Sequence, residues 1–511
     1  MEDSIKKMNE KMNILLINVP SRKGKGGFEL PLGLLYVGSI LERNGHTVKI
    51  YDPYLEDVEL NHIDSGDFTS LHRLIEEWKP SIIGYGGIAT SYTRAKKIST
   101  HIKSKYPDIF QIAGGALSTT YELLLSKGIV DVVFHGETET SLPDFLNRFS
   151  NNKPYDSLSG ISLLKNGSVV RNPAVTQIDN LDVIPLPAYQ LIDLKQYTHS
   201  INNWIDNYKI NTKDPENTII FKNIGNRTNY IPIATSRGCT HKCLFCYRHV
   251  QGIRRHSVGY VINHIKFLIE KYGIYGFQFC EELFNSDIKW VNEFVDAIER
   301  ENLSIFYLIA GARVDKINRD ILKRLADTGC IEVNYGHESG SDTILKEYRK
   351  GVTAATNSEV TLMTIQEGMS CPIQLVIGSP SETTRTIKET AKFLQKTKAT
   401  VCSLNYLIPL PETPIWQYVE QNALIPDVEK YLEDVSIIGG LAFINLTKQP
   451  DKVWKKWPNY INRAMHLNKL KKKTGKKYWM YYLVYFFKSM VPECAKNIIP
   501  ESVKKISRPG I

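Results

Sequence analysis

The feature that most restricts the fold is a regular alternation of strand and helix patterns over the first 150 residues. Short runs rich in Ile, Leu and Val predict strands, and they occur at 12–19, 46–52, 80–90, 108–119 and 130–137. Stretches with apolar residues at helical spacing lie between them, and the one that begins at Leu30 ends at Gly45, a typical helix stop. Strands that alternate with helices form a parallel sheet covered on both faces. The sequence therefore predicts an N-terminal, doubly wound, Rossmann-like parallel sheet.

Glycines and hydroxyl residues follow three of these predicted strands, at 86–92, 114–119 and 135–140. Ligands of such sheets bind outside the carboxyl ends of the strands. Glycine lets the backbone approach a flat ligand, and Ser or Thr hydroxyls can bond amides or phosphate. A GxGxxG fingerprint is absent from the sequence, which disfavours a nicotinamide cofactor. Ordinary glycine-rich turns are the alternative interpretation of these segments.

Three of the eight cysteines stand within eight positions, as Cys239, Cys243 and Cys246. Their C-x3-C-x2-C segment follows a predicted strand and a glycine turn at Gly238. Thiolates favour iron–sulfur clusters or zinc. A structural zinc site wants four protein ligands, for which His241 or His249 is available. A 4Fe–4S cube held by three thiolates leaves one iron open for a cofactor or substrate, whereas three cysteines without a metal are the third alternative.

The segment after the cysteines predicts further strand–helix repeats with polar or special residues at the strand ends. Residues at carboxyl ends of strands form the active sites of βα barrels. These ends carry Glu281 and Glu282, Arg313, Glu338 and Ser339, Gly378, Pro380 and Glu382, and the segment from Pro409 to Pro414. We therefore expect a partial barrel with a central pocket. The remaining cysteines of this region, Cys280, Cys330, Cys371 and Cys402, are expected to pack in core strands.

The predicted architecture is α/β, with the Rossmann-like sheet followed by a partial (β/α)6 TIM-like barrel and a mainly helical C-terminal region. The expected domains are residues 12–150 for the sheet, 151–228 for a connector, 229–430 for the barrel and 431–511 for the helical region. The connector is expected to have little regular structure, although "KNG" at 165–167 is typical of a hairpin.

The N-terminal region resembles the cobalamin-binding domain that precedes a radical SAM domain. The segments "LPLGLLYVGSILERNGHTVKIYD", "GGALST" and "DVVFHGETET" carry this resemblance, which covers residues 12–150. It implies that a corrinoid lies across the strand ends. The D-x-H-x-x-G motif is missing, as in the subset that lacks a histidine beneath cobalt. The matching positions are Pro31, Leu32, Gly33, Thr90, Ser91, Gly114, Gly115, Gly136 and Glu137.

The cysteine spacing, with Phe245 before the last cysteine, resembles the signature of radical SAM enzymes. That resemblance implies a 4Fe–4S cluster on Cys239, Cys243 and Cys246, whose open iron binds the amino and carboxylate groups of S-adenosylmethionine (SAM). One electron then releases a 5′-deoxyadenosyl radical. The residues implied in SAM binding are Phe245, Glu282, Arg313, Glu338, Ser339, Gly378 and Glu382.

The combined resemblance is to class B radical SAM methyltransferases and to the anaerobic magnesium-protoporphyrin monomethyl ester cyclase-like group. It implies a cobalamin-dependent enzyme that methylates an unactivated carbon or phosphorus of a small-molecule or lipid-like substrate. Oxidative cyclisation or another carbon–carbon rearrangement with the same cofactors is an alternative. A non-catalytic zinc- or corrinoid-binding module with a nucleic-acid-binding tail is another. A methylthiotransferase would need N-terminal cysteines, and residues 1–238 contain none.

The positive charge of the chain lies in its C-terminal part. Residues 451–511 contain fifteen Lys and Arg against three acids, or +12, so the +10 chain has −2 elsewhere. Lysines beside aromatic residues at 469–490 predict peripheral membrane contact, with helix packing on the barrel or, less favoured, RNA binding as alternatives. The polar N-terminus predicts no secretory signal, and hence a cytoplasmic protein that is peripheral at the membrane if the tail contacts lipid. The radical SAM resemblance implies an electron donor such as ferredoxin or flavodoxin.

Overall fold

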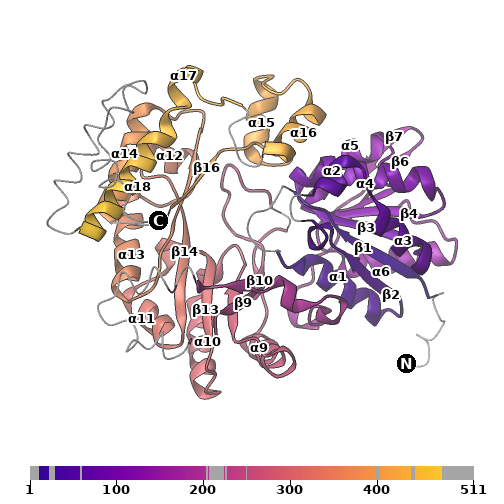
Figure 1. Ribbon diagram of the computed structural model, residues 1–511, viewed down its shortest axis with the longest axis horizontal. Coiled ribbons are helices and arrows are strands. Elements are labelled where there is room, and N and C mark those ends of the chain that lie inside the picture. Colours follow the sequence, from indigo (N-terminus) through magenta and orange to yellow (C-terminus); the bar gives the residue numbers. More distant parts are fainter. Residues whose placement is uncertain are drawn as a thin grey trace, which may run out of the picture. The chain divides into compact units, whose positions relative to one another are not determined.

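The computed structural model describes residues 11–21, 29–57, 60–202, 205, 224, 227–248, 250–397, 402–438 and 444–474. The chain forms two compact units. One consists of Met1–Val333 with Ile408–Ile444, and the other of Asn334–Leu407 with Asn445–Ile511. Both units combine strands with covering helices (Figure 1).

The expected parallel sheet forms in the first unit, in the strand order β2-β1-β3-β4-β5 (Figure 1). Its strands are β1 (Asn13–Asn18), β2 (Thr47–Tyr51), β3 (Ile82–Gly87), β4 (Phe110–Gly115) and β5 (Val132–Phe134). Strand β1 pairs in parallel with β2 on one side and with β3 on the other. The winding direction therefore reverses between β1 and β3, and this switch point is where such sheets bind ligands.

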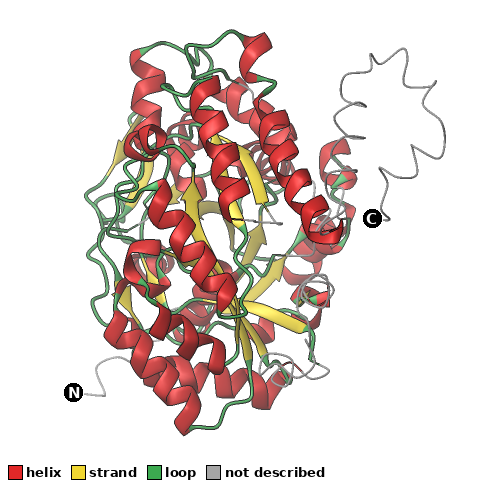
Figure 2. Ribbon diagram, turned by 90° about the vertical axis from the view of Figure 1, so that its left-hand side faces the viewer, coloured by secondary structure: helices red, strands yellow, loops and turns green. Residues whose placement is uncertain are grey.

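Helices cover both faces of this sheet (Figure 1). Figure 2 distinguishes the helices and strands of the described chain by colour. They are α1 (Leu32–Arg43), α2 (Asn61–Ser65), α3 (Thr69–Trp78), α4 (Tyr92–Lys105), α5 (Tyr121–Ser126) and α6 (Thr138–Ser150). Ile14 and Leu16 pack into one core with residues of α1 and α6. Leu15 and Ile17 pack into the other, with residues of α2 to α5. Because both faces are buried, the four central residues of β1, from Ile14 to Ile17, are all apolar rather than alternating.

The expected connector begins with regular structure, which corrects the sequence interpretation. Strands β6 (Ile161–Lys165) and β7 (Ser168–Arg171) form an antiparallel hairpin, and β6 pairs with β5. Asn166 and Gly167 turn the hairpin with φ of 51° and 77°, as the "KNG" segment predicts. The hairpin thus extends the first sheet, because the edge of β5 offers unpaired backbone groups. Three short 3-10 helices follow, at Leu181–Val183, Tyr189–Leu191 and Leu194–Tyr197.

The first unit also contains the first part of the predicted barrel. Strands β9 (Asn229–Ile233), β12 (Gly276–Phe279) and β13 (Phe306–Ala312) are parallel neighbours, and β8 (His199–Ser200) pairs antiparallel with β9. Helices α9 (Val258–Tyr272), α10 (Ile288–Arg300) and α11 (Arg319–Asp327) follow these strands. Ser257, Asp287 and Asn318 begin the three helices, since their side chains accept hydrogen bonds from backbone N–H groups.

The later strand–helix repeats belong to the second unit. Strand β14 (Cys330–Glu338) begins in the first unit and continues into the second. Strand β15 (Ile373–Ile377) pairs in parallel with β14 and with β16 (Cys402–Tyr406). The helices are α12 (Asp342–Glu347), α13 (Ala354–Gln366), α14 (Thr384–Thr397), α17 (Asp451–Trp454) and α18 (Trp457–Thr474). Trp457 Nε1 donates to Thr384 Oγ1 at 3.1 Å, which ties α18 to α14.

Two helices of the C-terminal part belong to the first unit, α15 (Pro414–Gln421) and α16 (Val428–Ile438). Helix α16 packs on α4, where Glu429 accepts from Lys96 Nζ at 2.7 Å and from Tyr92 Oη at 2.8 Å. The described C-terminal part is helical, and the order of strands and helices is the predicted one. The α/β fold class predicted from the sequence is therefore confirmed.

Candidate functional site

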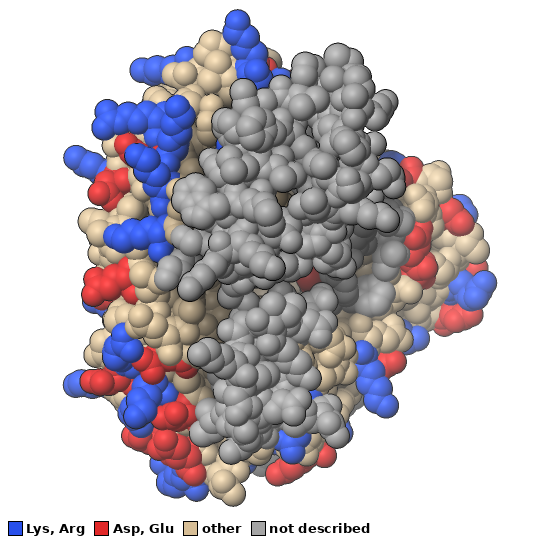
Figure 3. Space-filling view, turned by 60° about the vertical axis from the view of Figure 1, so that its left-hand side comes forward, with Lys and Arg blue, Asp and Glu red and all other residues tan. Residues whose placement is uncertain are grey.

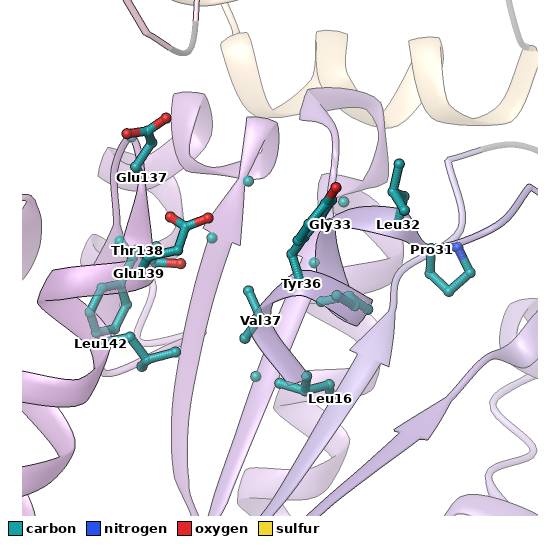
Figure 4. A pocket seen from close by; sticks show the side chains of 18 of the residues that line it. Leu16, Pro31, Leu32, Gly33, Tyr36, Val37, Glu137, Thr138, Glu139 and Leu142 are labelled. Atoms are coloured by element: carbon teal, nitrogen blue, oxygen red, sulfur yellow. The ribbon is translucent and has the colours of Figure 1, made fainter. Parts of the chain in front are cut away.

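A cavity of about 600 Å³ lies at the carboxyl ends of the strands of the first sheet (Figure 4). It opens at the switch point between β1 and β3. Helices α1 and α6 border it, and Leu16, Val37 and Leu142 line its apolar depth. An apolar cavity with a few polar groups at one end is typical of a cofactor site.

Seven of the nine residues predicted to bind cobalamin line this cavity. They are Pro31, Leu32, Gly33, Gly114, Gly115, Gly136 and Glu137. A Cβ atom added at Gly33 would meet nothing within 4 Å, so this glycine faces open space. Gly115 and Gly136 have φ of 67° and 72°, a region that other residues rarely adopt. Glycine therefore both opens the cavity and permits the sharp turns after β4 and β5.

The other two predicted residues, Thr90 and Ser91, lie elsewhere. The Ser91 side chain is fully buried, and its Oγ donates to the carbonyl of Val19 at 2.9 Å. The carbonyl of Thr90 accepts a hydrogen bond from Ser436 Oγ of α16 at 2.5 Å. Both residues shape the loop after β3 rather than the wall of the cavity.

Four buried oxygen atoms at the polar end of the cavity have no hydrogen-bond partner within the described structure. They are Tyr36 Oη, Glu139 Oε2, Ser236 Oγ and Glu281 Oε2. Unpaired buried polar atoms are costly, and they indicate a ligand with polar groups of its own. The edge of a corrin ring carries amides that both donate and accept hydrogen bonds. Together with the glycine-lined opening, these atoms fit a corrinoid.

The side chain of Glu137 is occupied by protein groups. Arg254 donates to its two oxygens at 2.9 and 2.7 Å, and the backbone N–H of Ile178 donates at 3.1 Å. Burial opposes ionisation of Glu137, but the hydrogen bonds from Arg254 and Ile178 outweigh it and lower its pKa. Glu137 therefore holds a negative charge beside the cavity, although its pairing with Arg254 was not foreseen.

The three clustered cysteines lie on a loop between two short strands, β10 (Ser236–Arg237) and β11 (Arg254–Arg255), which pair antiparallel. The loop closes tightly at Gly238, whose φ is 86° and whose added Cβ would lie 2.4 Å from the carbonyl oxygen of Gly252. Cys243 is buried, Cys239 is half-buried and Cys246 is exposed. The backbone N–H of Cys246 donates to the carbonyl of Cys243 at 3.4 Å.

Within the described residues, no three Cys, His, Asp or Glu side chains converge as ligands of a single metal ion. In a 4Fe–4S cube the protein thiolates bind three different irons, so their sulfur atoms need not converge on one point. Three thiols on one short, glycine-closed loop fit such a cube. His249, one of the two histidines weighed for zinc, lies outside the described residues.

Cys280 corrects the expectation that the remaining cysteines pack in core strands. Cys330 and Cys371 are buried as expected, and Cys402 is half-buried. Cys280, directly after β12, is exposed to the cavity. The surrounding protein still disfavours its charged form and raises the pKa of its thiol to about 12. The residue is therefore a neutral thiol that faces the cavity.

Three of the residues predicted to bind SAM lie in the first unit. Phe245 is half-buried on the cysteine loop. Glu282 lines the cavity, and burial raises the pKa of its carboxyl group. Arg313 is buried, and its Nε and Nη2 donate to the carboxylate of Asp315 at 2.7 and 2.9 Å. Its two-pronged guanidinium, predicted to hold the SAM carboxylate, thus contacts Asp315 here.

The other four predicted SAM residues lie in the second unit. Glu338 has a φ of 58° and accepts from Lys350 at 3.2 Å, while Ser339 Oγ lies 3.1 Å from Thr390 Oγ1. Gly378 donates its N–H to Glu382 Oε2 at 2.5 Å. Burial raises the pKa of Glu382 to about 8. This loop is therefore closed by its own glutamate.

The segment predicted to contact membranes, 469–490, has no described side chains. Within the described part of the chain, none of the helices has the length and hydropathy that a membrane span requires. Figure 3 shows Lys, Arg, Asp and Glu side chains on the described part of one face. Membrane contact through 469–490 stays a prediction.

Comparison with known proteins defines the class of the chain. Residues 26–146 match the B12 binding domain, and residues 233–394 match the Radical SAM superfamily. The chain is a cobalamin-binding radical SAM enzyme. The cofactors of the two domains are cobalamin, and a 4Fe–4S cluster with SAM.

The chain is similar to a curated methyltransferase and to a curated ring cyclase. It is 28% identical over 426 residues to "Uncharacterized methyltransferase PH0819" of Pyrococcus horikoshii. The aligned region covers 81% of this chain and 84% of the relative. It is 22% identical over 422 residues to the anaerobic magnesium-protoporphyrin IX monomethyl ester cyclase of Rubrivivax gelatinosus, covering 80% and 70%. The fold is similar to that of the radical SAM methyltransferase TsrM from Kitasatospora setae, with a TM-score of 0.63 at 18% identity over 81% of this chain and 77% of TsrM.

Sequence reasoning missed the residues that join the cavity to the cysteine loop, namely Tyr36, Glu139, Arg237, Arg254 and Cys280. Arg237 stands two positions before Cys239, and Glu139 stands two after Glu137. Their positions next to recognised motifs are the signal that could have drawn attention to them. Tyr36 likewise lies inside the segment that begins at Leu30, whereas Arg254 follows an irregular loop and carries no such signal.

Proposed function

We propose that this protein is a cobalamin-dependent radical SAM methyltransferase that acts on an unactivated carbon or phosphorus of a small-molecule or lipid-like substrate. Cys239, Cys243 and Cys246 hold the cluster. Residues Pro31, Gly33, Gly114, Gly115 and Gly136 contact cobalamin.

The cavity supports this function because two functional regions share it. One wall comes from the strand ends of the first sheet. The other comes from Ser236, Arg237 and Gly238, which lead into the cysteine loop, and from Cys280, Glu281 and Glu282 after β12. A ligand in this cavity thus contacts the residues that border the cluster loop, which is what a reaction using both cofactors requires.

When bound, the cluster and SAM supply a carbon radical that removes a hydrogen atom, and cobalamin supplies a methyl group. The protein binds and orients these partners. Apolar residues such as Leu16, Val37 and Leu142 keep the depth of the cavity dry. Glu282 lines the cavity of the first unit and is one of the SAM-binding residues. In the second unit, Glu338, Ser339, Gly378 and Glu382 are the residues that bind SAM.

The experiment that tests this function follows the methyl group of SAM. The full-length protein is reconstituted anaerobically with iron, sulfide and cobalamin, and incubated with methyl-labelled SAM, a reductant and extracts of cells that lack the gene. Methyl transfer predicts label in a product together with 5′-deoxyadenosine. An unlabelled product with 5′-deoxyadenosine supports cyclisation instead, to which the 22% identity with the ring cyclase adds weight. A colourless protein that retains one zinc ion would contradict both.

The partners proposed for this enzyme have separate tests. A low-potential donor such as ferredoxin or flavodoxin supplies the electron, so a donor that reduces the cluster must support SAM cleavage. Segment 469–490 contacts anionic membranes. Vesicle flotation with and without anionic lipid measures this contact, and an absence of flotation with either vesicle contradicts it.

A further inference from the structure

The cysteine loop carries an arginine at each of its two ends. Arg237 lies on β10 and Arg254 on β11, and the two residues are directly paired in the antiparallel register of these strands. All three clustered cysteines lie between them. Whatever holds the two guanidinium groups therefore fixes both ends of the loop.

Both arginines bind the same short segment of the first sheet domain. Arg254 donates to both oxygens of Glu137, and Arg237 lies 2.6 Å from Glu139 Oε1 and 3.3 Å from Glu137 Oε1. The two glutamates stand at the start of α6, just after Gly136. The side chains of Glu137 and Glu139 are 3% and 8% exposed, and those of Arg254 and Arg237 are 13% and 20% exposed. Buried charges of this kind need their partners, because an unpaired one is strongly unfavourable.

Backbone contacts reinforce this arrangement. Arg254 Nη1 also donates to the carbonyl of Ile178 at 2.5 Å, while the N–H of Ile178 donates to Glu137 Oε2. On the other side, the guanidinium of Arg237 lies 5.4 Å from the ring centre of Tyr36 on α1. The group is thus anchored on α1, on α6 and on the segment before the 3-10 helix Leu181–Val183.

The glutamates of this group also line the cofactor cavity. Glu137, Thr138, Glu139 and Arg237 are all part of its wall, whereas Arg254 is not part of it. In Figure 4 Glu137, Thr138 and Glu139 lie on one side of the cavity and Tyr36 on the other. A ligand that orders this wall therefore also orders the partners of the two arginines.

We propose that Glu137, Glu139, Arg237 and Arg254 form a clamp that couples cobalamin binding in the cavity to the geometry of the cysteine loop. This inference rests on the proposed function. The four residues act as positioning residues, and Arg254 acts on the corrinoid only through Glu137. By thermodynamic reciprocity, the assembled cluster tightens cobalamin binding by the same factor by which cobalamin tightens binding of the cluster to the loop.

The test measures the dissociation constant of hydroxocobalamin for the full-length protein with its cluster and after removal of the cluster. We expect the wild type to bind at least about 5-fold more tightly with the cluster, the lower end of typical coupling. Arg254→Lys keeps the charge but loses the two-pronged contact, and Arg254→Gln loses both. The ratio of the dissociation constant without the cluster to that with the cluster should fall towards 1 in Arg254→Gln. It should fall to an intermediate value in Arg254→Lys.

A second readout does not depend on cobalamin affinity. Hydrogen exchange of residues 238–252 in the cluster-loaded wild type should slow on addition of hydroxocobalamin, and this slowing should disappear in Arg254→Gln. The matched control is Asp296→Asn, which removes the partner of Arg324 between α10 and α11. It should preserve both the ratio and the slowing.

A ratio of 1 in the wild type, or an unchanged ratio in both Arg254 variants, would overturn the clamp while leaving the proposed function intact. Failure of the wild type to bind cobalamin at all would overturn both. Circular dichroism of each variant identifies loss of fold. If Arg254→Gln does not fold, Arg254→Lys and Glu139→Gln, which leaves the Arg254–Glu137 pair in place, supply the same comparison.

Discussion

The strand ends of the first sheet and those that follow the cysteine loop are built from different residues. Gly86, Gly114 and Gly136 stand at or after β3, β4 and β5, and together they leave an open cavity of about 600 Å³. The later strands end in charged groups, such as Arg313 and Glu338.

Most of these charged groups find their partners in their own unit. Arg313 pairs with Asp315, Glu338 with Lys350, and Glu382 with the N–H of Gly378. Strand ends in the same α/β arrangement thus form an open cavity in the first sheet and carry charged side chains in the later strands. An open cavity can hold a large cofactor such as cobalamin, which carries its own amide groups. Charged side chains can bind a smaller ionic ligand such as SAM. If the two regions bind different ligands, a substitution in one region should leave ligand binding in the other unchanged.

The largest effect is expected at the cysteine loop. Replacing Cys239, Cys243 or Cys246 by Ala should lower the cluster content and the rate of SAM cleavage at least about 100-fold, because even outer partners of metal ligands cost 10–100-fold. Iron analysis and the visible absorbance measure the cluster, and 5′-deoxyadenosine measures cleavage. Cys371→Ala, in the buried core, is the control. A Cys246→Ala variant that retains cluster and cleavage would contradict the assignment.

The next effect is expected in the cavity. Gly33→Phe places a ring where an added Cβ meets nothing within 4 Å, and it should weaken cobalamin binding about 10-fold or more by occupying the space. Cluster content should stay unchanged. Gly259→Phe is the control, since Gly259 lies exposed in the first turn of α9. Equal cobalamin affinity in Gly33→Phe and wild type would show that this cavity is not the cobalamin site.

The effect expected at Glu382 is on stability rather than on cofactor binding, and it depends on pH. Its pKa rises from 4.5 to about 8 on folding because the carboxyl group is buried. The folded state therefore binds the proton more tightly, and its stability falls as pH rises from about 4.5 to about 8. Glu382→Gln removes this dependence and should be more stable than the wild type at pH 8, by about 4 kcal/mol if the whole pKa shift is expressed.

Thermal unfolding at pH 5 and pH 8 measures this difference. From pH 5 to pH 8, the melting temperature of the wild type should decrease more than that of Glu382→Gln. Glu359→Gln, an exposed position on α13, should follow the wild type. Parallel pH curves for wild type and Glu382→Gln would show that the buried carboxylate has another stabilising partner.

The smallest effect is expected at Glu429, on the helix that packs against the first sheet. Hydrogen bonds from Lys96 and Tyr92 lower the pKa of Glu429 to about 2. Its stabilisation is therefore present above about pH 4.5 and disappears as the pH falls towards 2. Glu429→Gln should cost about 1 kcal/mol at neutral pH. Urea unfolding measures it, and a smaller loss is expected for Glu433→Gln, whose contact with Lys96 is 3.5 Å.

Local patterns were sufficient for the order of elements and for most of the cavity. Apolar runs identified β1 and β3. The glycine pair Gly114 and Gly115 identified a wall of the cavity, because a sharp turn with a positive φ favours glycine wherever it occurs. Ser91 was matched by its position in a motif, yet its hydroxyl donates to Val19. Which way a side chain points within a loop depends on neighbours that a motif does not contain.

The clamp shows the limit of sequence reasoning more clearly. Arg254 and Glu137 are 117 positions apart, and nothing near either residue indicates the other. Cys280 was expected to pack within a core strand as a small hydrophobic residue, but β12 ends one residue earlier.

The sequence by itself determined the alternating α/β fold, the loop of three cysteines and the glycine-lined strand ends, because each of these depends on residues close together in the chain. Only the tertiary structure decided which polar groups meet. It paired Glu137 with Arg254, left Tyr36 Oη and Ser236 Oγ facing the cavity, and brought Cys280 to its wall. The physical reason is that hydrogen bonds and ion pairs act over a few ångströms in space, whatever the distance along the chain.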